Sequence, residues 1–187
     1  MIGPAAISAL EKGRDVTATQ FPLAASGGVF LSIVGVAIIL GAVRFRSRNA
    51  LLATGAALAT IVTALVAPTL TARAGVPTIA QIIWLAAAVA AEIVLLAVFI
   101  RRAAPHGERA LVLTILGIVA AHFLPMAPAF GPPMILLGLL CAANVLLAAR
   151  ITDYSLRSVW AVDGALKAAI GALLFASPPV DALFSTC

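Results

Sequence analysis

Apolar segments of nearly 20 residues recur from one end of this chain to the other. An α-helix needs about 20 consecutive apolar residues to cross the hydrocarbon core of a bilayer. Lipid offers the backbone no hydrogen-bond partners, so spanning segments must be helices or the strands of a closed barrel. The sequence predicts an all-α polytopic membrane protein, a single bundle of six transmembrane helices over Phe21–Val43, Ala50–Thr69, Pro77–Ile100, Ala110–Leu124, Met134–Ala149 and Val159–Ala176.

Composition supports this class. The chain has 187 residues, of which 63% are hydrophobic and 10% charged, whereas a soluble domain is about 45–50% apolar and about 25% charged. The net charge of +5 comes from basic residues in short loops, where they set membrane orientation, so no nucleic-acid partner is expected. We expect an extramembrane or interfacial segment over residues 1–20, a transmembrane domain over 21–177 and a short tail over 178–187.

The loops predict how the protein sits in a bacterial inner (plasma) membrane. Three alternate loops carry eight arginines, and the opposite side carries only Lys12, Arg14 and Arg73. Basic loops remain on the cytoplasmic side. Both termini are therefore expected outside, and the bilayer is the first expected partner.

The two halves of the chain show faint similarity. Residues 32–36 (SIVGV) resemble residues 114–118 (TILGI). Two three-helix halves of opposite orientation form an inverted repeat in many transporters. A 3+3 inverted repeat is one interpretation, and chance similarity between apolar segments is the other. Gly28, Ser32 and Gly35 also fall on one face of the first helix, which favours close helix packing there.

Four ionisable residues lie within the predicted spans: Glu92, His122, Asp163 and Lys167. Asp163 and Lys167 are four residues apart, so they share one helical face, with the acid before the base. Charged groups at membrane depth usually face the protein interior or a water-filled cavity. These residues are therefore the first candidates for a functional site.

Depth brings more of the polar residues together. At 1.5 Å per residue, Glu92 and Lys167 lie about 12–15 Å from the arginine-rich loops, and Asn144 lies level with Asp163. One interpretation is a shared polar site, with His122 marking a route outward, in a proton-coupled transporter or proton-conducting protein that moves a proton or small solute. The alternative is a structural or accessory membrane subunit whose buried charges fix helix packing. Neither interpretation requires a cofactor, and no second His or Cys lies at metal-ligand spacing from His122.

The last helix carries the pattern Asp163-x-x-x-Lys167-x-x-x-Gly171, which resembles the retinal-bearing last helix of microbial rhodopsins. By that resemblance Lys167 would bind retinal, with Asp163 as its counterion. Gln81 and Glu92 are spaced like the counterion and proton-donor positions of the pumps. The chain departs from that family in having six predicted spans and a glutamine at position 81. A retinal- or lipid-binding membrane protein is thus a third class.

A second pattern is Gly117-x-x-x-x-His122-Phe123-x-Pro125-x-Ala127-x-x-Phe130. It is similar to small uncharacterised six-helix bacterial membrane proteins, and it implies an architecture but no activity. Pro125 and Pro128 are expected to unwind the outer end of the fourth helix, so Pro125 and Phe130 are secondary site candidates beside His122. Pro68 is likewise expected to end the second helix.

No nucleophile elbow, phosphate loop or zinc-protease motif occurs, so an enzyme is not expected. The six helices of a single chain of this size leave few residues to enclose a pathway across the membrane. We therefore expect a homo-oligomer, with a dimer as the simplest form.

Overall fold

The computed structural model describes residues 21–176; the predicted terminal segments lie outside these residues. Each of the six long helices is apolar and long enough to cross a bilayer, which confirms an all-α integral membrane protein. Their bounds are α2 (Ala24–Val43), α3 (Arg48–Ala74), α4 (Ile79–Ala103), α5 (Glu108–Phe130), α6 (Pro133–Arg150) and α7 (Leu156–Ala176), and two short 3₁₀ turns, Phe45–Ser47 and Ala104–His106, connect neighbours.

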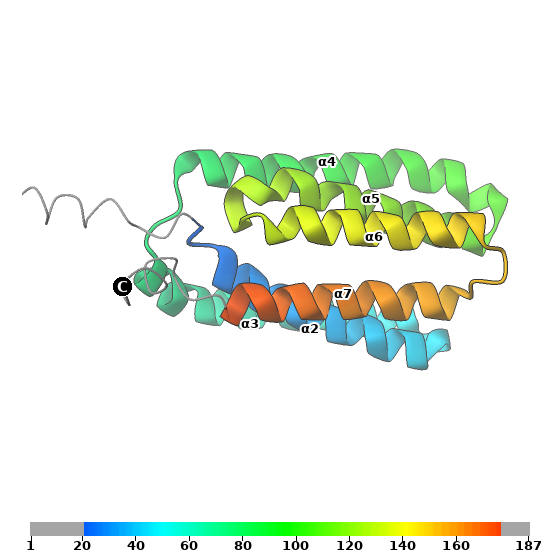
Figure 1. The fold of residues 1–187 in the computed structure, drawn as a ribbon, viewed down its shortest axis with the longest axis horizontal. Coiled ribbons are helices and arrows are strands. Elements are labelled where there is room, and N and C mark those ends of the chain that lie inside the picture. The colour runs from blue at the N-terminus through cyan, green and yellow to red at the C-terminus, as the bar shows by residue number, and fades with distance from the viewer. Residues whose placement is uncertain (1–20, 177–187) are drawn as a thin grey trace, which may run out of the picture.

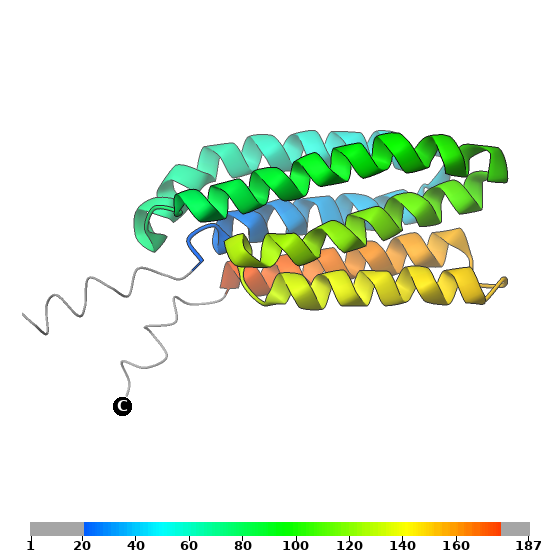
Figure 2. The same ribbon diagram turned by 90° about the horizontal axis from the view of Figure 1, so that it is seen from above.

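The helices form two rows of three (Figures 1 and 2). One row holds α3, α2 and α7, and the other holds α4, α5 and α6. The rows meet through packing of α6 on α7, with lighter contacts from α5 to α2 and α7. Although α3 and α4 follow each other in sequence, they do not pack together as α6 and α7 do. In a strict 3+3 repeat these two pairs would correspond, so the inverted repeat stays a prediction.

The tightest interface joins the first and last long helices. A Cβ on Gly28 would lie 2.6 Å from the Gly171 carbonyl oxygen, and one on Gly164 would lie 2.8 Å from the Gly35 carbonyl oxygen. The two helices therefore run antiparallel with their backbones nearly touching. Small residues allow this approach between membrane helices, so the small-residue face predicted on the first helix is confirmed.

Two expectations about proline are wrong. Pro68 lies inside α3, which continues to Ala74, and Pro125 and Pro128 lie inside α5, which continues to Phe130. Proline removes one backbone donor, but transmembrane helices tolerate this because neighbouring groups satisfy the freed carbonyls. Helix α5 ends instead at Gly131, which adopts a φ of 99° that favours glycine.

One end of the bundle is strongly basic, and we call it the arginine end. Helix termini bring eight arginines there: Arg44, Arg46, Arg48, Arg101, Arg102, Arg109, Arg150 and Arg157. Arg48 forms an ion pair with Glu108. Arg109 donates hydrogen bonds to the carbonyls of Tyr154 (2.9 Å) and Ile151 (3.0 Å), which holds the α6–α7 turn against α5. The gathering of these residues at one end agrees with six crossings, while the side of the membrane remains a prediction.

Candidate functional site

The last helix carries a charged pair inside the protein. Lys167 donates a hydrogen bond to Oδ2 of Asp163, and the two residues are only 3% and 1% exposed. The other carboxylate oxygen, Oδ1, accepts no hydrogen bond from an N–H or O–H group of the described residues. The buried thiol of Cys141, on α6, lies beside this carboxylate. The pair is thus neutral as a whole, with one oxygen that can still accept a hydrogen bond.

A second pair bridges α4 and α5. Glu92 Oε2 lies 3.5 Å from His122 Nε2. The other ring nitrogen of His122, Nδ1, lies 2.6 Å from the Val119 carbonyl oxygen. Because a carbonyl can only accept, we assign the hydrogen to Nδ1. Nε2 is then the nitrogen that can gain or lose a proton while facing the carboxylate.

Phe123 contacts a member of each pair. The centroid of the Phe123 ring is 4.4 Å from the centroid of the His122 ring and 5.6 Å from Nζ of Lys167. Glu92 and Lys167 are each eleven residues from the arginine end of their helices, or about 16 Å along the axis. The pairs therefore lie level, near the middle of a hydrocarbon core about 30 Å thick.

The structure brings the predicted charges together in a different pairing. Glu92 and Lys167 were expected to share one site, and they do lie at one depth. Glu92 is paired with His122, however, and Lys167 with Asp163. The arrangement is two neighbouring acid–base pairs on α4, α5 and α7, and the ring of Phe123 contacts both pairs.

Asn144 does not complete this network. Its amide nitrogen donates to the Val159 carbonyl at 2.9 Å, and its oxygen accepts from the Tyr154 hydroxyl at 3.0 Å. These bonds join α6 to the start of α7, closer to the arginine end. Asn144 is therefore an interhelical tie. Its hydroxyl partner precedes α7 in a turn, so sequence spacing alone did not suggest the bond.

The secondary candidates also lie apart from the ion pairs. Gln81 forms a capping box with Thr78 at the start of α4, which fixes that helix terminus. Phe130 packs its ring against Gly27 of α2. Pro125 continues α5 beyond His122.

Neither a metal ion nor retinal is suggested by this packing. Within the part of the chain that the structure describes, no three His, Cys, Asp or Glu side chains could hold a metal ion. Lys167 is enclosed by Asp163 and by the ring of Phe123. Helix α7 also lies against α2 at Gly164 and Gly171 on either side of this lysine. The surroundings of Lys167 therefore do not fit a bulky chromophore.

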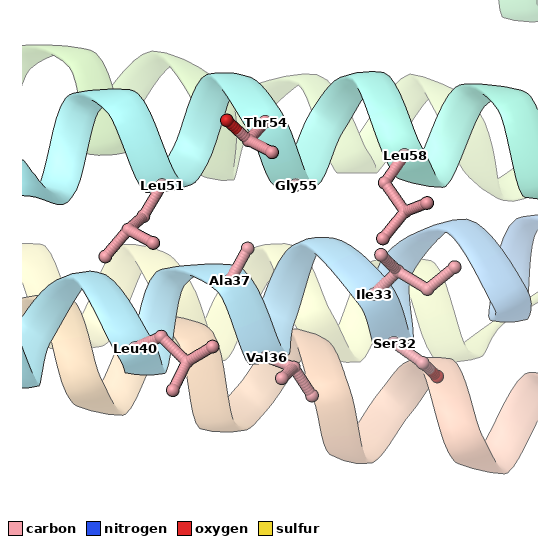
Figure 3. Close-up of a pocket in the computed structure, with 9 residues that line it drawn as sticks. All are labelled: Ser32, Ile33, Val36, Ala37, Leu40, Leu51, Thr54, Gly55 and Leu58. Atoms are coloured by element: carbon pink, nitrogen blue, oxygen red, sulfur yellow. The ribbon is translucent and has the colours of Figure 1, made fainter.

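A groove lies elsewhere, between α2 and α3 (Figure 3). It has a volume of about 400 Å³ and an almost wholly apolar wall. Its lining residues are Ser32, Ile33, Val36, Ala37, Leu40, Leu51, Thr54, Gly55 and Leu58. It includes none of the ionisable residues, so the groove and the ion pairs are separate features.

The model of a family of unknown function matches residues 14–182, which is most of the chain. No curated protein and no solved structure matches it.

Proposed function

The chain belongs to a family of unknown function (DUF6609), and from the geometry of its own residues we propose that it moves protons, or a small solute coupled to protons, across the membrane. The observation that carries this proposal is that two acid–base pairs, Glu92–His122 and Asp163–Lys167, lie next to each other at mid-membrane depth. Ionisable residues are costly in hydrocarbon and commonly mark ion or proton pathways. Four ionisable residues lie close together on three helices that pack against one another, which is more than a single packing contact requires.

The proton chemistry can be written for each pair. A proton on His122 Nε2 can pass to Glu92 Oε2, which leaves a neutral imidazole and a neutral acid. Nδ1 keeps its hydrogen bond to Val119 throughout. On α7, the Lys167 ammonium can pass a proton to Asp163, which leaves an amine and an acid. Both steps conserve protons and require no further reactant.

The two pairs are close enough to influence each other. If the Glu92–His122 pair loses its shared proton, it carries a net negative charge. The ammonium of Lys167, across the ring of Phe123, then experiences that charge in a medium that screens poorly. Release of a proton at one pair would thus favour retention of a proton at the other.

Proton flux in liposomes tests the proposal. Purified protein is reconstituted with a pH-sensitive dye inside, and a potassium diffusion potential drives protons inward. We expect Glu92→Gln and Lys167→Met to lower the flux at least tenfold. Glu108→Gln makes the same chemical change at the arginine end and should leave the flux unchanged. Equal flux in all variants, or in liposomes without protein, would contradict the proposal.

A structural or accessory subunit is the second candidate. The observation that favours it is that each carboxylate already lies against a basic side chain of the same chain, Glu92 against His122 and Asp163 against Lys167. This candidate predicts that Glu92→Gln and Lys167→Met reduce thermal stability in detergent and change no flux. Measurement of both quantities on the same preparations separates the two candidates.

We include a homodimer in the proposal. Helices α3 and α4 are the least buried of the six, and both present large apolar side chains outward, among them Leu65 and Ile93. Light scattering of the purified protein, corrected for bound detergent, should give twice the monomer mass; a single-chain mass would exclude the dimer.

A further inference from the structure

The α2–α3 groove occupies one half of the membrane thickness. Along α2 it extends from Ser32 to Leu40, a rise of eight residue steps or about 12 Å. Leu40 is three residues from the end of α2 at Val43. The groove therefore runs from the arginine end toward mid-membrane. That depth is the one taken by the acyl chains of a single leaflet, since half of the hydrocarbon core is about 15 Å.

Unpaired positive charge lies directly above the groove. The backbone N–H of Arg44 donates to the Leu40 carbonyl at 2.9 Å, so Arg44 follows the groove wall by one helical turn. Arg46 lies in the 3₁₀ turn that joins α2 to α3. Both side chains are exposed, and neither forms an ion pair with any residue between 21 and 176.

The remaining arginines of this corner are already engaged. Arg48 pairs with Glu108, and its guanidinium lies 4.0 Å from the centroid of Phe45. The guanidinium of Arg157 lies 5.7 Å from the centroid of the same ring. Phe45 thus fixes two cations beside the turn, while Arg44 and Arg46 are left for a partner outside the described residues.

We infer that the α2–α3 groove is a binding site for an anionic phospholipid, with an acyl chain between the two helices and the phosphate at Arg44 and Arg46. A volume of about 400 Å³ lies within the range of small-ligand sites, roughly 300–1,000 Å³. Basic groups at the membrane surface attract anionic head groups, and basic pockets between helices can select them. The site has an apolar groove for an acyl chain and, at its arginine end, two exposed arginines for the phosphate of the same lipid molecule.

Charge favours a lipid over a second copy of the chain. Two copies inserted in the same direction place their arginine ends in the same leaflet. A second copy in the groove would therefore bring its own arginines beside Arg44 and Arg46, and like charges repel. A phosphate brings the opposite charge to the same place.

Lipid retention tests this site in the full-length protein. The protein is purified in a mild detergent, incubated with phosphatidylglycerol or phosphatidylcholine, and examined by native mass spectrometry. We expect retained phosphatidylglycerol and little phosphatidylcholine. Val36→Phe, which fills the groove from an exposed wall position, and Arg44→Gln with Arg46→Gln should each reduce retention at least fivefold.

Matched controls keep the test specific. Val94→Phe makes the same change on an exposed position of α4, and Arg150→Gln removes an exposed charge at the arginine end of α6. Both should retain the lipid as the wild type does. Equal retention of the two lipids, or equal losses in the control variants, would overturn the proposal. Loss of a dimer in Val36→Phe with lipid retained would assign the groove to a second copy instead.

Discussion

At the scale of single residues, the Asp163–Lys167 pair should show an asymmetry between its single and double variants. Removal of one partner leaves an uncompensated buried charge, which costs about 3–5 kcal/mol, whereas replacement of both by apolar residues is often close to neutral. We expect Lys167→Met alone to lower the unfolding temperature in detergent strongly. Asp163→Leu with Lys167→Met should recover most of that loss. If the double variant is no more stable than the single one, the pair does not act as a unit.

The candidate residues could be found from sequence, but their partners could not. Hydropathy and helical spacing predicted that Asp163 and Lys167 share a face, which the structure confirms. Spacing within one helix cannot give the rotation of neighbouring helices. For this reason the pairing of Glu92 with His122, the Tyr154–Asn144 bond and the position of Phe123 were all missed.

At the scale of helices, the contact between α2 and α7 predicts sensitivity to one added methyl group. A Cβ on Gly164 would lie 2.8 Å from a backbone oxygen of α2, so Gly164→Ala must push the helices apart. Such overpacking typically costs about 1–3 kcal/mol. Gly117→Ala is the control, because its nearest new neighbour would be a Val145 methyl at 3.8 Å. We expect a lower unfolding temperature for the first variant and an unchanged or higher one for the second.

Helix number and order were predictable, while helix ends were not. Six apolar segments of bilayer length give six helices almost regardless of context. The sequence predicts helix ends at Pro68, Pro125 and Pro128, because proline usually ends a helix whose backbone can hydrogen-bond to water instead. In lipid the backbone has no such alternative, so α3 and α5 continue through their prolines.

At the scale of the whole molecule, the distribution of arginine predicts orientation. The arginine end should face the cytoplasm and both termini should lie outside. A reporter that is active only in the periplasm should be active when fused after Cys187, and inactive when fused within the loop after Arg102. The opposite result would reverse the topology and place the lipid site in the outer leaflet.

The pairing of α2 with α7 means that the α2 interface stays incomplete until α7 has been synthesised. The glycine face of the first long helix enters the membrane more than a hundred residues ahead of its partner. That partner is also the least hydrophobic of the six, with a mean hydropathy of 1.6. A chain that ends after Arg150 would expose the glycine face of α2 to the bilayer. Pulse-chase labelling should show that this shortened chain is degraded much faster than the 187-residue chain. Helix α7 thus completes an interface that α2 begins, so the lifetime of the earlier helices in the membrane depends on the insertion of α7.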